Sequence, residues 1–143
     1  MIKKLFIAAG LVAFVACSRH EVASVPSLVK WQSSYQQALA QAKSEKKLVM
    51  VDIYTDWCGW CKRLDKDVYA NAAVAEALAK HFIPVKVNPE KSREGAELAK
   101  KFGTQGFPHI VFVNGNGEKV AEISGYLPPT DFIGQLASAA QKL

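Results

Sequence analysis

This chain of 143 residues has few cysteines, few long apolar runs and only a small excess of positive over negative charge. Three cysteines are too few for a disulfide-stapled scaffold, and too few for a zinc site closed by four thiolates. The apolar run at residues 5–16 would measure about 18 Å as a helix, short of the roughly 30 Å hydrocarbon core of a bilayer. The composition, 50% apolar and 22% charged, excludes long disorder, collagen and coiled coil. The length therefore predicts one domain with a substantial core.

Positive charge is weak and scattered. The net charge of +5 falls to +3 without residues 1–16, which carry two lysines and no acidic residue. The densest basic pairs, Lys46-Lys47 and Lys100-Lys101, fall at the ends of expected helices, where lysines are common. No aromatic side chains alternate with basic ones, as a stacking platform for bases would require. We therefore expect no nucleic-acid partner.

Residues 1–16 have the three parts of a secretory signal, with Lys3 and Lys4 ahead of the apolar run. Because the run is too short to span a bilayer, it indicates a cleaved signal peptide rather than a transmembrane anchor. We expect a chain exported to a bacterial cell envelope, facing the periplasm.

The end of the signal indicates how the mature chain begins. Phe14-Val15-Ala16-Cys17 resembles a bacterial lipobox, whose cysteine is lipidated and becomes the mature N-terminus, although Phe14 stands where leucine is usual. We expect lipid on Cys17, a tether over residues 17–27, and attachment to the outer membrane, because Ser18 rather than aspartate follows the cysteine. The alternative is ordinary cleavage after Ser18, which would leave a soluble periplasmic protein.

The rest of the chain alternates between strand and helix patterns. The nearly continuous apolar run at residues 48–54 suits a central strand covered on both faces. Asn114-Gly-Asn-Gly117 is a strong hairpin signal, and Ser34 to Gln37 is a plausible capping box. Strands are predicted at residues 28–31, 48–54, 82–87, 110–113 and 119–124, and helices at 34–44, 58–78 with a break and cap near Asn71, 92–102 and 130–143. This order predicts a single α/β domain over residues 28–143, with helices on both faces of a sheet closed by an antiparallel hairpin.

The chemistry is concentrated around Trp57-Cys58-Gly59-Trp60-Cys61. Residues at i and i+3 share a helix face, with Cβ atoms about 5–6 Å apart, so the two sulfurs can be brought together. A helix N-terminus stabilises the thiolate of Cys58, and thiolate is the nucleophile of disulfide exchange. Cys61, one turn further on, is placed to attack a mixed disulfide and release the product. The motif therefore predicts a redox pair.

Other uses of two such cysteines fit less well. Half of a zinc site would need a second pair, and His20, His81 and His109 show no ligand spacing, so we expect no metal. Covalent haem attachment would need histidine where Lys62 stands.

Residues 51–62, from Val51 to Lys62, resemble the strand-to-active-site sequence of the thioredoxin family, and the likeness covers nearly the whole chain after the leader. It implies the thioredoxin fold, with a central mixed sheet, and a thiol–disulfide oxidoreductase whose cysteine pair needs no further cofactor. In the family the carboxylate corresponding to Asp52 is buried beneath the second cysteine and exchanges a proton with it. Lys86 falls where the family often has a lysine beside that carboxylate. Gly106-Phe107-Pro108 matches the loop whose proline is cis and packs against the redox pair.

Two departures refine the resemblance. The dipeptide Gly59-Trp60 stands where thioredoxin itself has Gly-Pro, and residues 67–71 interrupt the helix where thioredoxin has a proline. The second feature is similar to secreted thioredoxin-like proteins and to the soluble C-terminal domain of the transmembrane disulfide reductase of bacteria. The resemblance implies protein thiols and disulfides as partners, a dedicated envelope electron donor, a monomer and a mainly reductive role.

Two hypotheses of different classes follow. The favoured one is an enzyme with Cys58, Cys61, Asp52 and Pro108 at its centre and Lys86 in support; client contacts are expected from Trp57, Gly59, Trp60, Phe107 and His109. For His109 the alternatives are tuning of the thiolate and a spectator role. The second hypothesis is a binding module for a client peptide, or for a metal such as copper held by Cys58, Cys61 and His109. The presence of all four central residues favours the enzyme.

Overall fold

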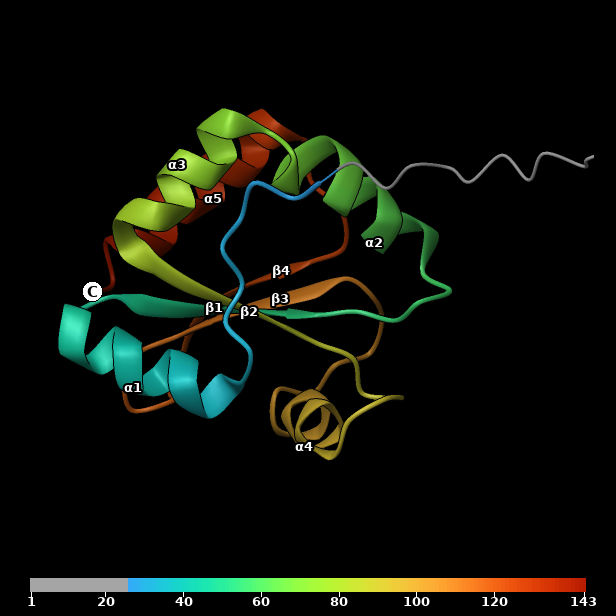
Figure 1. The fold of residues 1–143 in the computed structure, drawn as a ribbon, viewed down its shortest axis with the longest axis horizontal. Helices are drawn as coiled ribbons and strands as arrows, with labels where there is room; N and C mark the ends of the chain where they lie inside the picture. Colours follow the sequence, from blue (N-terminus) through green and yellow to red (C-terminus); the bar gives the residue numbers. More distant parts are fainter. Residues whose placement is uncertain (1–25) are drawn as a thin grey trace, which may run out of the picture.

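Four strands form one mixed sheet in the computed structural model, which describes residues 26–143 (Figure 1). The expected signal peptide, Cys17 and most of the expected tether lie outside the described residues. The elements, in chain order, are α1 (Tyr35–Glu45), β1 (Leu48–Ile53), α2 (Gly59–Leu64), the π-helix η1 (Asp65–Tyr69), α3 (Ala72–His81), β2 (Phe82–Val87), α4 (Arg93–Lys101), β3 (His109–Val113), β4 (Lys119–Ser124) and α5 (Pro129–Ala140).

The strands lie in the order β2-β1-β3-β4. β1 pairs with β2 in parallel and with β3 antiparallel, and β3 and β4 form the antiparallel hairpin expected from the Asn-Gly repeat. In this register Asp52 lies opposite Lys86 on one side and Ile110 on the other. The predicted mixed sheet is therefore confirmed.

Helices cover both faces of the sheet, with α1 and α4 on one side and α2, α3 and α5 on the other (Figure 1). Every residue of β1 is buried, because alternate side chains point into the two cores. Val49, Val51 and Ile53 pack on the α1/α4 side, whereas Met50 packs on the side of α2, α3 and α5. By the same alternation, the Asp52 side chain faces the α2 side of the sheet.

The first predicted strand, at residues 28–31, does not form. The Leu28 backbone N–H donates to the Tyr69 carbonyl at 3.0 Å, while the Gln32 N–H donates to Pro84 at 2.8 Å, so the segment divides its hydrogen bonds between two elements. Only one bridge, from Gln32 to Val85, joins it to β2. A strand needs a ladder of such bonds along one neighbour, and this segment instead crosses the edge of the sheet.

The predicted break in the helix after the cysteines is present. The Asn71 side chain accepts hydrogen bonds from the backbone N–H groups of Ala73 and Val74, at 2.9 and 3.3 Å, and so starts α3. The π-helical turn of η1 precedes this cap, and the sequence patterns did not predict it. It directs the side chains of Asp65 and Tyr69 toward the sheet, where they take part in the site described below.

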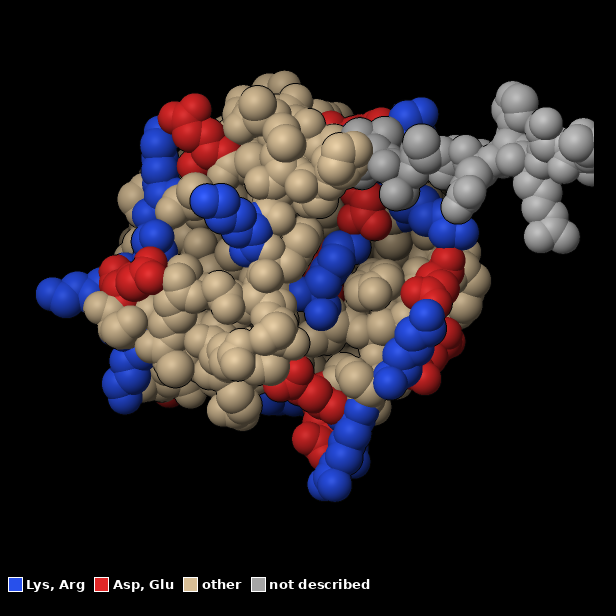
Figure 2. All heavy atoms as spheres, in the orientation of Figure 1, with Lys and Arg blue, Asp and Glu red and all other residues tan. Residues whose placement is uncertain are grey.

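Charge is mixed over the face shown in Figure 2, where Lys and Arg side chains lie among Asp and Glu side chains without a continuous basic area. Among residues 26–143 no helix has both the length and the apolar character needed to cross a bilayer.

Two glycines in helices provide a test of the packing. A Cβ atom on Gly95, in α4, would lie 2.6 Å from the Asn88 carbonyl oxygen, whereas one on Gly134, in α5, would meet no atom within 4 Å. We expect Gly95→Ala to lower the free energy of unfolding, because backbone must move to admit the methyl group. Gly134→Ala should raise it by about 0.5–1 kcal/mol, since alanine is the better helix former. Urea denaturation measures both, and equal effects of the two substitutions would contradict this packing.

Candidate active site

The expected redox pair lies at the edge of the sheet where β1 and β2 end and β3 begins. β1 and β2 are parallel, so their carboxyl ends meet at one edge of the sheet, beside the start of β3. From that edge the chain turns through residues 54–57 into α2, which begins directly after Cys58. Cys58 and Cys61 form a disulfide with Cα atoms 5.3 Å apart. The pairing that the spacing predicted is thus present.

Both cysteines of the disulfide are buried, since only 4% of the surface of Cys58 and 2% of that of Cys61 is exposed. Cys58 is the N-cap of α2, and its Sγ accepts a hydrogen bond from the Cys61 backbone N–H at 3.1 Å. This N–H would favour a negative charge on the Cys58 sulfur once the disulfide is opened. The geometry suits the nucleophile's role that was predicted for Cys58.

Asp52 is a buried carboxylate whose charge few neighbouring groups stabilise. It is 1% exposed, and neither of its oxygens meets hydrogen-bond geometry with any residue in the described part of the chain. The Lys86 ammonium lies 3.2 Å from Oδ2 as an ion pair. Burial raises the pKa of Asp52, and Lys86 opposes this shift without cancelling it. The carboxyl group is therefore a better proton acceptor than an exposed aspartate.

Lys86 is held by groups that the sequence patterns did not single out. Its Nζ lies 2.7 Å from Asp65 of η1, and 4.3 Å from the centre of the Tyr54 ring. The rings of Trp31 and Tyr69 lie at 5.6 and 5.5 Å. Burial alone would lower the pKa of Lys86, but the two carboxylates outweigh it and raise the pKa.

Tyr69 adds a second buried polar group beside this pair. Its hydroxyl lies near enough to Asp52 to lower the carboxyl pKa, yet within residues 26–143 it makes no hydrogen bond of standard geometry. Burial, and then the Asp52 charge, raise the pKa of Tyr69 well above 10.0, so this hydroxyl stays protonated. Spacing along the chain does not reveal Asp65 or Tyr69, because both reach the site through the π-helical turn.

The segment before the disulfide is fixed by the loop that follows β2. The Trp57 indole N–H donates to both carboxylate oxygens of Glu90, at 3.0 and 3.1 Å. Asp56 accepts a hydrogen bond from Asn88 and pairs with Lys91. Trp57 nevertheless keeps 66% of its surface exposed, so its orientation is set while its ring stays accessible.

Trp60 lies on the other side of the pair and is 55% exposed. Its ring packs on that of Tyr126 with centroids 5.6 Å apart, and the Arg63 guanidinium lies over both rings. Asp67 accepts hydrogen bonds from Arg63 and from the Tyr126 hydroxyl, at 3.2 and 3.3 Å. The predicted client contact at Trp60 is therefore an ordered surface, to which Tyr126 and Arg63 belong.

The proline loop (residues 105–108) contacts the residue that precedes the disulfide. The Phe107-Pro108 peptide bond is cis, as the resemblance implied. The Phe107 ring meets the Trp57 ring edge to face, with centroids 5.8 Å apart. The Pro108 carbonyl accepts a hydrogen bond from Gly125, whose φ of +89° favours glycine.

Gly59 has open space around it, as a residue facing a client would.

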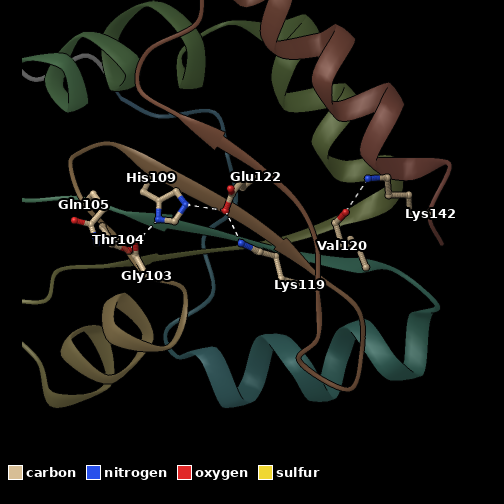
Figure 3. A network of polar contacts seen from close by, with 8 residues as sticks. All are labelled: Gly103, Thr104, Gln105, His109, Lys119, Val120, Glu122 and Lys142. Atoms are coloured by element: carbon tan, nitrogen blue, oxygen red, sulfur yellow. Dashed lines mark hydrogen bonds and ion pairs between the residues drawn. The ribbon is translucent and has the colours of Figure 1, made fainter.

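His109 lies apart from these groups. Like Val111 it points to the α1/α4 side of the sheet, the opposite side from Asp52. Its Nδ1 contacts the Thr104 hydroxyl at 2.9 Å and its Nε2 contacts Glu122 at 3.3 Å (Figure 3). No group of three His, Cys, Asp or Glu side chains suited to a metal ion occurs within residues 26–143. The structure thus does not gather Cys58, Cys61 and His109 into a metal site.

Comparison with known proteins agrees with this geometry. Residues 35–140 match the family model described as a thioredoxin-like domain. The chain belongs to the thioredoxin-like family. It has the thioredoxin fold and carries a disulfide between two cysteines at the spacing of a redox pair.

Individual relatives of this thioredoxin-like chain come from both sequence and structure. It is 36% identical over 107 residues to the thiol:disulfide interchange protein DsbD of Vibrio cholerae, covering 73% of this chain but 18% of that protein. A solution structure of a thioredoxin from Thermus thermophilus matches with a TM-score of 0.71 and 28% identity, covering 80% of this chain and 88% of that one. The reduced C-terminal domain of Neisseria meningitidis DsbD matches with a TM-score of 0.61 and 25% identity, covering 73% and 92%. The chain thus spans about a fifth of the length of the curated relatives that it matches.

The raised pKa of Asp52 predicts a pH-dependent stability. The carboxyl group binds its proton at a higher pH in the folded chain than in the unfolded one, so burying its charge destabilises the fold at neutral pH. We expect Asp52→Asn to raise the free energy of unfolding at pH 7, with Lys86 still paired to Asp65. This advantage should shrink as the pH falls through the raised pKa of the folded state toward 3.8, and should vanish below that value, where wild-type Asp52 is protonated in both states.

Urea denaturation of the oxidised protein between pH 4 and pH 8 measures this difference. Glu76→Gln is the matched control, because the Glu76 carboxylate is largely exposed and only pairs with Lys80 across one helical turn. A gap between Asp52→Asn and wild type that stayed constant over this range would show that the Asp52 charge does not produce it.

Proposed function

We propose that the chain reduces protein disulfides in a bacterial envelope through the Cys58–Cys61 pair. The observation that carries this proposal is the disulfide at the start of α2, on the side of the sheet that holds the buried Asp52 carboxylate. Exposed, ordered aromatic rings at Trp57 and Trp60 flank the pair and offer a surface for a polypeptide client.

The first step is attack by the reduced pair. The Cys58 thiolate, supported by the Cys61 backbone N–H, attacks one sulfur of the client disulfide. A new S–S bond joins Cys58 to the client, the client's own S–S bond breaks, and its other sulfur leaves as a thiolate.

The second step releases the client. Cys61 gives up its thiol proton to Asp52, the one carboxylate that is buried among residues 26–143, and the new thiolate attacks Cys58. The mixed disulfide breaks, the client leaves with its second sulfur reduced, and Cys58–Cys61 closes as seen in the structure. Two electrons have passed to the client. The raised pKa of Asp52 supports this role, because a carboxylate with an ordinary pKa would be a poor base for a thiol.

A reductant in an oxidising compartment has to be reduced again by another dithiol. The kinship with thiol:disulfide interchange proteins supports exchange with the dithiol or disulfide of another protein. The buried Asp52 carboxylate, as an acceptor for the Cys61 proton, supports the reductive direction. The lipobox-like segment supports anchoring through Cys17, at the outer membrane in preference to a soluble periplasmic state. The mass of the mature N-terminus distinguishes these two states.

The roles of the two cysteines can be separated by substitution. We expect Cys58→Ser to abolish insulin reduction, because the attacking sulfur is gone. Cys61→Ser should instead trap clients as mixed disulfides, because the resolving thiolate is missing. Non-reducing electrophoresis followed by mass spectrometry identifies the trapped species. Trapping by Cys58→Ser in place of Cys61→Ser would reverse the assignment.

The direction of electron flow is tested by the reduction potential of the Cys58–Cys61 couple. Titration against glutathione should give a value below roughly −200 mV, in the range of reducing members of the family. A value near −120 mV, typical of a strong envelope oxidant, would overturn the reductive proposal and indicate a protein that oxidises client thiols.

A further inference from the structure

His109 is a buried histidine for which the disulfide chemistry has no direct use. It is 5% exposed and points away from Asp52, on the opposite side of the sheet. Both of its ring nitrogens are already engaged, by Thr104 and by Glu122 (Figure 3). A side chain with both nitrogens in use is poorly placed to bind a client, but well placed to hold other parts of the chain together.

The two partners of His109 lie on either side of the proline loop. Thr104 directly precedes the loop and is itself fixed, since its backbone N–H donates to Ala99 of α4 at 2.9 Å. His109 directly follows the loop, so the Thr104–His109 contact closes the loop at its base. Glu122 lies on β4 and is held by Lys119 at 2.8 Å. The histidine therefore ties the loop to α4 on one side and to β4 on the other.

Little apolar packing supports the first half of the loop. Gln105 and Gly106 are exposed, and an open groove of about 480 Å³ runs along this side of the loop. The second half is held by Phe107, which packs on the α1/α4 core and on the Trp57 ring, and by the Gly125–Pro108 hydrogen bond. The contacts of His109 with Thr104 and Glu122 add side-chain bonds that close the base of the loop. Because the Trp57 contact joins the loop to the residue before Cys58, a shift of the loop would alter the client surface beside the disulfide.

Thr104 and Glu122 can both keep their hydrogen bonds to His109 whether the imidazole ring is neutral or charged. A carboxylate only accepts hydrogen bonds, so Nε2 carries the proton that faces Glu122. The Lys119 ammonium, and then His109, lower the pKa of Glu122, which keeps it anionic. A threonine hydroxyl both donates and accepts, so it donates to Nδ1 of a neutral ring and accepts from Nδ1 of a charged one.

We propose that His109 is a positioning residue, which clamps the proline loop through Thr104 and Glu122 and so sets the affinity for protein clients without tuning the disulfide. The proposal rests on the proposed function for its kinetic consequences. It replaces the expected client contact at His109 with an indirect role, exerted through Phe107 and the loop.

Thr104 offers a matched pair of variants. Thr104→Val keeps the shape and removes the hydroxyl, whereas Thr104→Ser keeps the hydroxyl. We expect Thr104→Val to raise KM for insulin by about 3- to 10-fold with kcat little changed, as expected for the loss of one hydrogen bond that organises the binding surface. Reduction of a small aromatic disulfide, which needs no extended surface, and the reduction potential should both stay at their wild-type values. Thr104→Ser should behave as wild type.

A second variant tests the other arm of the clamp. Glu122→Ala removes the partner of Nε2 from an exposed position, where loss of folding is not expected, and should shift KM in the same direction. Glu76→Ala is its control, because it removes an exposed carboxylate on α3 that pairs with Lys80 and not with His109.

Amide hydrogen exchange at residues 105–107 provides a readout independent of turnover. It should quicken in Thr104→Val and in Glu122→Ala but not in Thr104→Ser or Glu76→Ala. If wild type fails to reduce insulin, the proposed function is wrong and the exchange data still decide the clamp. Wild-type exchange in Thr104→Val, a shifted reduction potential, or an equal loss of rate on insulin and on the small disulfide would each overturn the proposal.

Discussion

The burial of a carboxylate beside a single ammonium group is the constraint on which the site depends. Asp52 lies on a strand whose two faces are both covered, so its charge has no access to water. Lys86 can offset this cost only because parallel pairing of β1 and β2 places it directly opposite Asp52. The π-helical turn brings Asp65 to the same ammonium group, and the aromatic rings of Trp31, Tyr54 and Tyr69 enclose it. The fold thus keeps a destabilising charge where proton transfer to a thiol can use it.

The two sides of the sheet have different tasks. The side covered by α2, α3 and α5 holds Asp52 and Lys86, where charge and protonation matter. The other side holds His109, whose contacts concern the position of a loop. Ile53 pairs with His109, and the next pair along the two strands is Asp52 with Ile110. Because adjacent positions in a strand point to opposite faces, the side chains of these two pairs lie on opposite sides of the sheet. In the proposed scheme, this separation places client affinity and redox chemistry under the control of different residues.

Local patterns in the sequence were sufficient for most of the fold. The apolar run of β1, the Asn-Gly hairpin and the Asn71 cap depend on residues close together in the chain, and each is present as predicted. The redox pair was predictable for the same reason, because only two residues separate its members. The strand expected at residues 28–31 was not formed, because strand propensity cannot show whether a neighbouring edge is free along its length.

The parts of the site that escaped prediction depend on tertiary contacts. Asp65 and Tyr69 reach Lys86 through a π-helical turn, which has no signature in residue types. Glu90 lies 33 residues from Trp57, and Tyr126 lies 59 residues from Asp67, so neither partner could be inferred from spacing. The role of His109 stayed open because its ring contacts only become apparent once β4 is placed beside β3.

The positions of the tryptophans have a consequence for spectroscopy. The chain contains three tryptophans, and each of them belongs to the surroundings of the redox pair. Trp31 lies over Lys86, Trp57 precedes Cys58 and donates to Glu90, and Trp60 lies between the cysteines in sequence. The intrinsic tryptophan emission of the whole protein therefore originates at its site. A change of oxidation state, of protonation at Asp52 or of client occupancy can be followed optically in the unlabelled chain, with no background from distant indoles.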